Sequence, residues 1–162
     1  MTGPQLRVDI IDVYIFRATP PDIELLQLRR TRSPLSGSWQ PIMGHIEPGE
    51  TALTAARREV QEETGLDSAA PIVLGLWALE QVHPFYLPDL DAIILSPRFA
   101  LQVEASWTPT LNTEHDASRW IPARDAGEHF MWPGQRAAIA ELLSSLWPAD
   151  NPARARCSVQ SL

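Results

Sequence analysis

Three glutamates lie close together in the stretch R-R-E-V-Q-E-E-T-G-L, which begins at Arg57. Glu59, Glu62 and Glu63 fall within five consecutive positions. On a helix, residues three and four apart are neighbours on the surface, so these carboxylates would crowd together. Like charges at this spacing destabilise an exposed helix by roughly 0.2–0.5 kcal/mol per pair. The stretch is therefore either a solvated acidic helix end or a site for a cation.

The donor atoms indicate which cation would fit. Carboxylates on a rigid helix suit the hard cations Mg²⁺ or Mn²⁺, and the single cysteine, Cys157, is far along the chain, so zinc is not expected. A helical wheel groups Leu53, Ala56 and Val60 on an apolar face and places Glu63 at its border. We therefore expect Glu63 to be partly buried, which would force a proton onto the pair unless a cation is bound.

The helix that carries these residues has clear boundaries. The turn at Pro48-Gly49 precedes it, and Thr51 can cap a helix that runs over about residues 51–64. Gly65 stands where a left-handed C-cap residue belongs, and we assign it a structural role.

Strands are predicted on both sides of this helix. The first two form a hairpin around Pro20-Pro21, and this mixture favours an α+β sandwich over a doubly wound parallel sheet. We expect one domain over residues 1–148 and a mobile tail over residues 149–162, where no pattern persists. The predicted strands cover residues 7–17, 22–30, 39–46, 72–81, 91–95, 99–104 and 118–121, and a last helix covers residues 133–147.

Composition limits the partners. The 162 residues carry 44% hydrophobic side chains and a formal charge of −7. An acidic chain is not expected to bind nucleic-acid polymers or a membrane surface without specificity. The sequence shows neither a long apolar run nor a signal peptide, so we expect a cytoplasmic protein.

Residues 44–66, GHIEPGETALTAARREVQEETGL, resemble the Nudix box in every fixed position. Gly44 is followed by five residues and Glu50, and seven more lead to R-E-V-Q-E-E-T-G-L. The resemblance implies a Nudix-type α/β/α sandwich with a mixed β-sheet and a catalytic loop-helix-loop. It also implies a metal-dependent enzyme that hydrolyses a diphosphate linkage. Because so many positions match together, the cation-site interpretation becomes the leading one.

The resemblance assigns roles to residues of the box. Glu59, Glu62 and Glu63 become the acidic ligands of Mg²⁺ or Mn²⁺, and the carbonyl of Gly44 becomes a further ligand. Glu50 and Arg58 correspond to a pair that braces the loop against the helix, and we count Arg58 with the catalytic set. An Arg fork holds a carboxylate in a fixed geometry better than Lys would.

Motifs outside the box resemble one branch of the family, which contains dihydroneopterin triphosphate pyrophosphatases and nucleoside triphosphate pyrophosphohydrolases. They are W-Q-P at residues 39–41, E-H-D-A-S-R-W at residues 114–120 and W-P-G-Q-R at residues 132–136. In that branch the E-H pair supplies a further active-site glutamate, here Glu114, whereas His115 is interpreted as structural. The predicted substrate-binding residues are Trp39, Gln40, Arg29, Arg30 and Tyr86.

The predicted reaction converts a nucleoside or dihydroneopterin triphosphate to the monophosphate and pyrophosphate. A sugar-nucleotide or dinucleoside-polyphosphate hydrolase would use the same chemistry, and a non-catalytic Nudix-like module that only binds a ligand is a third hypothesis. A small phosphorylated substrate is the expected partner. Because family members are often dimers, a homodimer is a further expectation.

Overall fold

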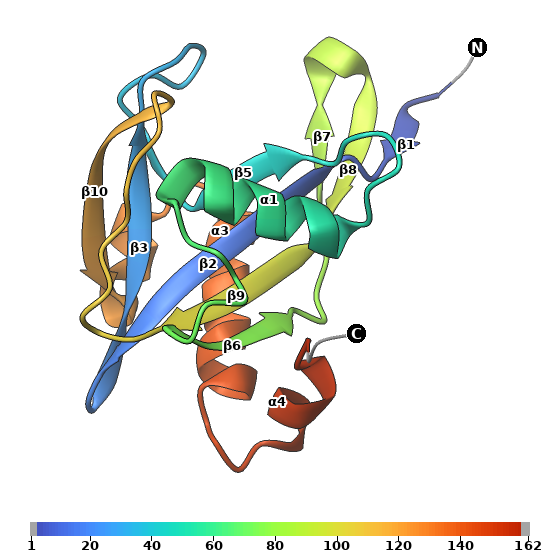
Figure 1. The fold of residues 1–162 in the computed structure, drawn as a ribbon. Coiled ribbons are helices and arrows are strands. Elements are labelled where there is room, and N and C mark those ends of the chain that lie inside the picture. Colours follow the sequence, from blue (N-terminus) through green and yellow to red (C-terminus); the bar gives the residue numbers. More distant parts are fainter. Residues whose placement is uncertain (1–2, 160–162) are drawn as a thin grey trace.

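A mixed β-sheet with helices on both faces forms the centre of the protein (Figure 1). The computed structural model describes residues 3–159. The strands are β1 (Gln5–Arg7), β2 (Ile10–Thr19), β3 (Asp22–Arg30), β4 (Trp39–Gln40), β5 (Ile42–His45), β6 (Val73–Ala78), β7 (His83–Leu87), β8 (Ala92–Ser96), β9 (Arg98–Val103) and β10 (His115–Pro122). The helices are α1 (Ala52–Thr64), α2 (Ala126–His129), α3 (Pro133–Glu141) and α4 (Pro152–Cys157), with 3₁₀ turns at Pro88–Leu90 and Ala123–Asp125 and a π-helical turn at Leu142–Leu146.

The main sheet has the order β10-β3-β2-β9-β6, with β4 paired to β3 and β5 paired to β2. Strands β2 and β3 form the predicted antiparallel hairpin, whereas β2 and β9 run parallel. A second sheet has the order β1-β8-β7. The α+β class with a mixed sheet is therefore confirmed.

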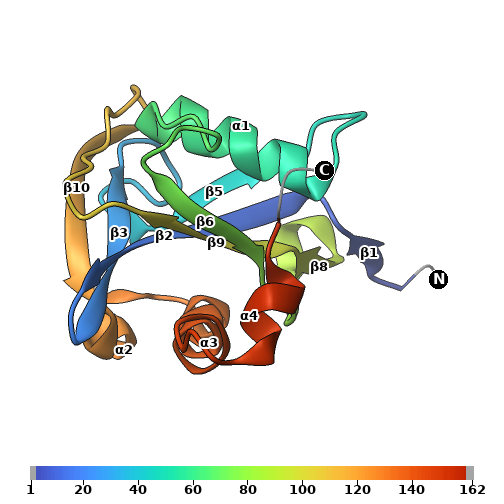
Figure 2. The ribbon, with the colours of Figure 1, turned by 60° about the horizontal axis from the view of Figure 1, so that its bottom comes forward.

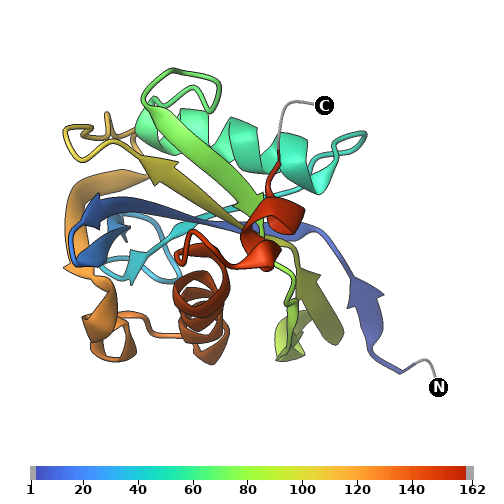
Figure 3. The same cartoon turned by 90° about the horizontal axis from the view of Figure 1, so that it is seen from below.

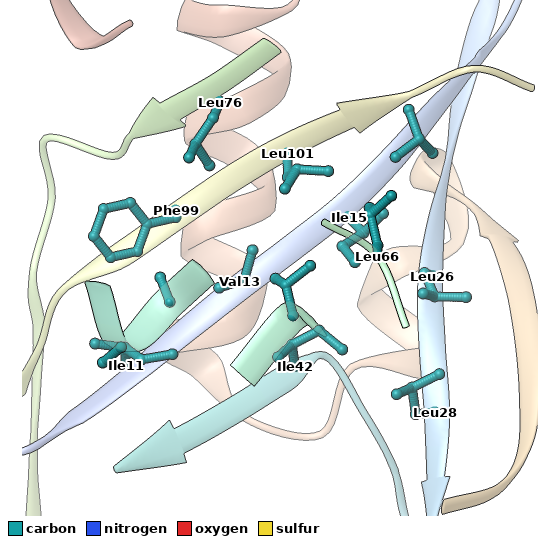
Figure 4. Packing of buried hydrophobic residues seen from close by; sticks show 14 residues of the cluster. Ile11, Val13, Ile15, Leu26, Leu28, Ile42, Leu66, Leu76, Phe99 and Leu101 are labelled. Carbon is teal, nitrogen blue, oxygen red and sulfur yellow. The ribbon is translucent and has the colours of Figure 1, made fainter. Parts of the chain in front are cut away.

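Alternation along β2 divides the interior into two cores. Ile11, Val13 and Ile15 face α1, whereas Tyr14 and Phe16 face α3. Figures 2 and 3 show α1 on one side of the main sheet and α3 on the other, which is the predicted α/β/α sandwich. Figure 4 shows how the aliphatic side chains on the α1 side interlock, and this packing fixes where α1 lies on the sheet.

The strand predictions fail where the chain changes sheets. One strand was predicted over residues 7–17, but β1 ends at Arg7 and β2 begins at Ile10, because β1 pairs with β8 and β2 pairs with β9. The same change of sheet separates β8 from β9 at Pro97, and there the two predicted strands, over residues 91–95 and 99–104, are confirmed. Strand β7 was missed, since its pairing with β8 and not its own short sequence makes it a strand.

The segment expected to be a mobile tail contains a short helix. Helix α4 is capped by Asn151, Ser158 bridges to Trp77, and the Val159 amide donates to the Leu76 carbonyl at 2.8 Å. The Arg154 guanidinium lies 4.7 Å from the centroid of the Trp77 ring. The sequence did not predict these contacts with β6. The mobility of the tail and the boundary at residue 148 stay predictions, and residues 160–162 of the tail lie outside the described residues.

A buried charged pair lies in the core on the α3 side. Asp12 on β2 is 6% exposed and Arg98 on β9 is 3% exposed, with Arg98 Nε 4.0 Å from Asp12 Oδ2. The Tyr14 hydroxyl donates to the same carboxylate at 3.3 Å, and Arg98 Nη1 donates to the Gly134 carbonyl at 2.8 Å. Burial raises the pKa of Asp12 to about 6 although Arg98 opposes the shift.

We predict that Asp12→Asn stabilises the protein above pH 6. Because the folded-state pKa of Asp12 lies above its ordinary value of 3.8, this group's contribution to stability is greatest below pH 4 and falls as the pH rises to 6. Asn does not ionise, so the variant does not lose this stability as the pH rises. The free energy of unfolding of Asp12→Asn at pH 8 should exceed the parent's by about 1–3 kcal/mol, with a smaller difference at pH 4. Urea unfolding at both pH values measures the effect.

The exposed Asp150 supplies the control for this experiment. Asp150→Asn removes the same charge without removing a buried one, so its unfolding should follow the parent at both pH values. An Asp12→Asn variant that is less stable than the parent at pH 8 would show that the Arg98 attraction outweighs burial.

Candidate active site

Helix α1 carries the glutamates at its C-terminal half. Thr51 caps the helix by accepting a hydrogen bond from the Thr54 amide, and Gly65 ends it with a left-handed φ of 71°. Ala55, Ala56 and Val60 are buried against the sheet, which sets the rotation of the helix. The predicted helix and both of its caps are therefore confirmed, and the three carboxylates leave the helix in fixed directions.

Arg58 joins the loop before α1 to the helix. Its guanidinium donates to both carboxylate oxygens of Glu50, at 2.9 and 3.0 Å, and to the His45 carbonyl at 2.8 Å. Glu50 also accepts from the Glu47 amide at 3.0 Å. The hydrogen bonds from Arg58 lower the pKa of Glu50, which stays ionised. The structure thus joins the two residues that the sequence predicted as a bracing pair.

The three glutamates differ in environment. Glu62 has a side chain that is 55% exposed, whereas those of Glu59 and Glu63 are 13% and 3% exposed. Burial raises the pKa of Glu63 to about 9, and the negative charges of Glu59 and Glu114 add to the shift. Burial also raises the pKa of Glu59, although its hydrogen bond with Arg58 opposes the shift. The buried oxygen Oε2 of Glu63 has no hydrogen-bond partner.

Gly44 on β5 allows Glu59 to lie against the strand. A Cβ atom at Gly44 would lie 2.0–2.3 Å from the terminal carbons and Oε1 of Glu59, a distance that real contacts do not reach. Only glycine therefore leaves room for the Glu59 carboxylate beside the β5 backbone. This close approach brings the backbone of Gly44 and a carboxylate of α1 to one place, as the predicted ligand set requires.

Glu114 faces the helix from the other side of the site. It immediately precedes β10, and its Oε1 accepts from Arg32 Nη1 at 2.8 Å. Its negative charge contributes to the raised pKa of Glu63, so the two carboxylates belong to one electrostatic cluster. Arg30 opposes that shift, and its Nε donates to the Arg32 carbonyl at 3.1 Å. Two arginines therefore lie beside the carboxylate cluster.

Arg29 and Arg30 were both predicted to bind substrate, but as neighbours on β3 they face opposite sides of the sheet. Arg29 donates to both oxygens of Asp116, at 2.7 and 3.1 Å, and faces away from the Glu63 side of the sheet. Trp39 lies on that same face, with the Arg119 guanidinium 4.2 Å from its ring centroid. Arg119 was missed by the sequence analysis, because only the pairing of β3 with β4 and β10 brings it to Trp39.

Two predicted substrate residues make other contacts. Gln40 is 4% exposed, and its amide nitrogen lies 3.4 Å from Nε2 of His115. Because this side chain is buried, we no longer assign Gln40 to the surface that contacts the substrate. Tyr86 lies on β7 and donates to Asp91 at 2.9 Å. Strand β7 belongs to the β1-β8-β7 sheet and β10 to the main sheet, and Figure 1 shows the two strands well apart.

Comparisons with known proteins agree with this architecture. The family model of the NUDIX domain matches residues 7–142. The chain belongs to the Nudix family. An octanoyltransferase from Myxococcus xanthus is 30% identical over 131 residues, which are 80% of the chain but only 35% of that relative's length. The chain thus spans about a third of this relative.

Two further relatives carry informative names. The asymmetrical bis(5'-nucleosyl)-tetraphosphatase of Rattus norvegicus is 32% identical over 104 residues, which cover 64% of the chain and 68% of the relative. The structure of the E. coli dihydroneopterin triphosphate pyrophosphohydrolase superposes with a TM-score of 0.69 at 25% identity, over 87% of this chain and 97% of that one. The domain match and these two relatives support the hydrolysis of pyrophosphate linkages in nucleotide-like substrates as the chemistry to propose for this chain.

The residues of this Nudix site fit a divalent cation, which family members generally use. The donors are carboxylate and carbonyl oxygens, Gly44 leaves the space that Glu59 needs, and the buried Oε2 of Glu63 lacks a partner. Within residues 3–159 no three acidic, His or Cys side chains already converge on one point. The carboxylates of Glu59 and Glu62 are instead paired with Arg58, whose Nη1 lies 2.8 Å from Glu59 and 3.4 Å from Glu62.

We predict that Gly44→Ala weakens cation binding without unfolding the protein. The added Cβ displaces the flexible end of Glu59, so Mn²⁺ affinity should fall by at least about tenfold while the unfolding temperature stays near the parent's. Titration calorimetry and thermal unfolding measure the two effects. Gly127→Ala is the matched control, since a Cβ there would meet nothing within 4 Å, and it should bind Mn²⁺ like the parent. Parental affinity in Gly44→Ala would contradict the prediction.

We also predict that Glu63→Gln stabilises the cation-free protein and abolishes its turnover. A folded pKa of about 9, against an ordinary value of 4.5, means that Glu63 lowers stability progressively as the pH rises from 4.5 to 9. Without added metal, Glu63→Gln should unfold at least about 2 °C higher at pH 8, with a smaller gain at pH 5. Metal-dependent turnover should fall by orders of magnitude.

The exposed neighbour Glu62 provides the comparison. Glu62→Gln changes the same charge on the same helix, but the side chain is 55% exposed, so the unfolding temperature should change little. If Glu63→Gln lowered the unfolding temperature at pH 8, the buried carboxylate of Glu63 would not be the group that destabilises the cation-free protein.

Proposed function

We propose that the chain hydrolyses a nucleoside-triphosphate-like substrate, a nucleoside or dihydroneopterin triphosphate, to the monophosphate and pyrophosphate. The main observation that supports this proposal is the cluster of Glu59, Glu62 and Glu63 beside Gly44. Arg30 and Arg32 lie next to this cluster. The similarity to the E. coli dihydroneopterin triphosphate pyrophosphohydrolase, which extends over 87% of the chain, supports this class of substrate.

In this proposal Mg²⁺ or Mn²⁺ neutralises the negative charge of the phosphates when it is bound. Glu59, Glu62 and Glu63 and the Gly44 carbonyl hold the cation, and Arg58 keeps the loop in place through Glu50. Glu114 would accept a proton from the water whose oxygen forms a new bond to phosphorus, while the anhydride P–O bond breaks and pyrophosphate leaves. Arg30 and Arg32 attract the phosphate groups, which the acidic cluster alone would repel.

Trp39 and Arg29 have a narrower part in this proposal than the sequence suggested. The Arg119 guanidinium already lies 4.2 Å from the centroid of the Trp39 ring, so Trp39 offers at most its other face to a flat base or pterin. Arg29 is engaged with Asp116. We therefore assign Trp39 a contact with the organic part of the substrate and assign phosphate binding to Arg30 and Arg32.

A dinucleoside polyphosphate is the second candidate substrate. The 32% identity with the rat bis(5'-nucleosyl)-tetraphosphatase favours it, although the match covers 64% of the chain. A sugar nucleotide would be cleaved by the same arrangement. A module that binds its ligand without catalysis is less well supported, because every fixed position of the box is present.

Other properties stay predictions. A homodimer and a cytoplasmic location were expected from the family and the sequence. No helix within residues 3–159 has the length and apolar character that a membrane span needs. Exposed apolar side chains are frequent on the β1-β8-β7 sheet, where Leu6, Ile93 and Tyr86 form one row across the three strands and are 67%, 38% and 53% exposed. We propose this row as the first surface to test for dimer contacts.

The substrate is tested by the products that the full chain releases. With Mg²⁺ present, we expect a nucleoside triphosphate or dihydroneopterin triphosphate to yield pyrophosphate, and we expect chelation to stop the reaction. Two phosphorylated organic products from a bridged diphosphate would instead assign the chain to the second candidate. Chromatography with ³¹P detection separates these outcomes across triphosphates, sugar nucleotides and dinucleoside polyphosphates.

The control for this screen is a pair of charge-matched variants. Glu63→Gln should lose activity on every substrate, whereas Glu104→Gln, an exposed carboxylate at the end of β9, should keep the parental rate. Tight ligand binding without any metal-dependent product, in a correctly folded parent protein, would contradict the enzymatic proposal.

A further inference from the structure

Two buried atoms without hydrogen-bond partners face each other behind the carboxylate cluster. Glu63 Oε2 and His115 Nδ1 are both buried and unpaired, and they lie 3.9 Å apart. Their side chains are 3% and 0% exposed. Burying a polar atom without a hydrogen-bond partner is unfavourable, so one hydrogen bond between these two atoms would satisfy both of them.

The other side of the His115 ring defines which nitrogen carries the proton. Gln40 Nε2 lies 3.4 Å from His115 Nε2, and an amide nitrogen can only donate. His115 Nε2 must therefore accept, and a neutral imidazole that accepts at Nε2 carries its proton on Nδ1. The N–H of His115 then points toward Glu63.

We infer that Gln40 and His115 are positioning residues for Glu63. The Gln40 amide selects the Nδ1–H tautomer of His115, and this N–H donates to Oε2 of the ionised Glu63, which leaves the other carboxylate oxygen free for the cation. The inference rests on the proposed function only in taking Glu63 as a cation ligand. It changes the role of Gln40 from substrate contact to support of a ligand, and it gives His115 a role beyond packing.

The fold explains why these residues meet. Gln40 ends β4, His115 begins β10, and the two strands pair with β3 from opposite sides, at Leu28 and Arg30, which places both side chains on the same face of the sheet. Glu63 reaches the same point from the last turn of α1. The present separation of 3.9 Å is longer than a hydrogen bond, as is common in sites before their ligands bind, and we expect it to shorten when Glu63 coordinates a cation.

The tautomer of His115 gives a direct test that does not depend on activity. In the Mg²⁺-loaded full chain, ¹⁵N NMR of the imidazole should show the proton on Nδ1 and a lone pair on Nε2 of His115. Gln40→Glu replaces the donating amide with an accepting carboxylate, so the proton should move to Nε2. A parent protein with the proton on Nε2 would overturn the inference. The spectrum of His115→Asn identifies which of the four histidines gives the signal.

Cation affinity tests the same contact with a matched pair of variants. The amide nitrogen of Asn lies close to the position of Nδ1 in His, whereas that of Gln lies close to Nε2. His115→Asn should therefore keep most of the parental Mn²⁺ affinity, and His115→Gln and Gln40→Glu should lose about 10–100-fold. Electron paramagnetic resonance titration of free Mn²⁺ measures the constants, and circular dichroism melts confirm that each variant is folded.

The outcomes separate this inference from the proposed function. If the parent binds Mn²⁺ and the Asn and Gln variants bind it equally well or equally poorly, the positioning role is wrong but the cation site stands. If the folded parent does not bind Mn²⁺ at all, the proposed function fails first. Both variants replace His115 at the same buried position. A difference in Mn²⁺ affinity between them therefore cannot be explained by a general loss of packing.

Discussion

The accumulation of negative charge at one end of α1 is the constraint on which the rest of the site depends. Glu63 is almost completely buried next to Glu59 and Glu114, and its pKa is raised to about 9. A carboxylate in such a place must bind a proton, pair with a cationic side chain or coordinate a metal. Arg58 satisfies Glu50, Glu59 and Glu62, but no described salt bridge from an arginine reaches Glu63. Among these glutamates, Glu63 is therefore the one whose negative charge a bound cation would stabilise most.

The sheet keeps these charges together against their repulsion. Helix α1 is held by its buried alanines and by Val60, and the loop before it is held by the bidentate contact of Arg58 with Glu50. Gly44 brings the edge of β5 into contact with the Glu59 carboxylate. The packed core thus holds carboxylates together that repel one another, which is a common arrangement in active sites.

Positive charge is distributed around the site with a clear separation between the two faces of the sheet. Arg30 and Arg32 are on the side of the carboxylates, whereas Arg29 and Arg119 are engaged with Asp116 and Trp39 on the opposite side. The chain is acidic as a whole, yet the place where phosphates would arrive is lined by guanidinium groups. The side chains proposed to bind phosphate and the side chain proposed to contact an organic group thus lie on opposite faces of the sheet.

The local chemistry of the site could be predicted from the sequence with good detail. The caps at Thr51 and Gly65, the apolar face with Ala56 and Val60 and the crowding of the glutamates all follow from spacing along one helix. The mixed sheet and the two layers of helices also followed from the order of elements and the family resemblance. These features depend on neighbours within a few residues, where helix and strand geometry alone fix the directions of the side chains.

Other features depended on contacts between distant segments. The strand β7 exists because β8 pairs with it, and the last helix packs on β6 through Trp77. Gln40 looked like a substrate contact, but the pairing of β4 and β10 with β3 turns it toward His115 and away from solvent. The sequence by itself determined which residues are the candidates for binding a cation and hydrolysing a diphosphate. Only the tertiary structure decided which carboxylate is buried and which side chains support it, because burial and register are set by strands far apart in the chain.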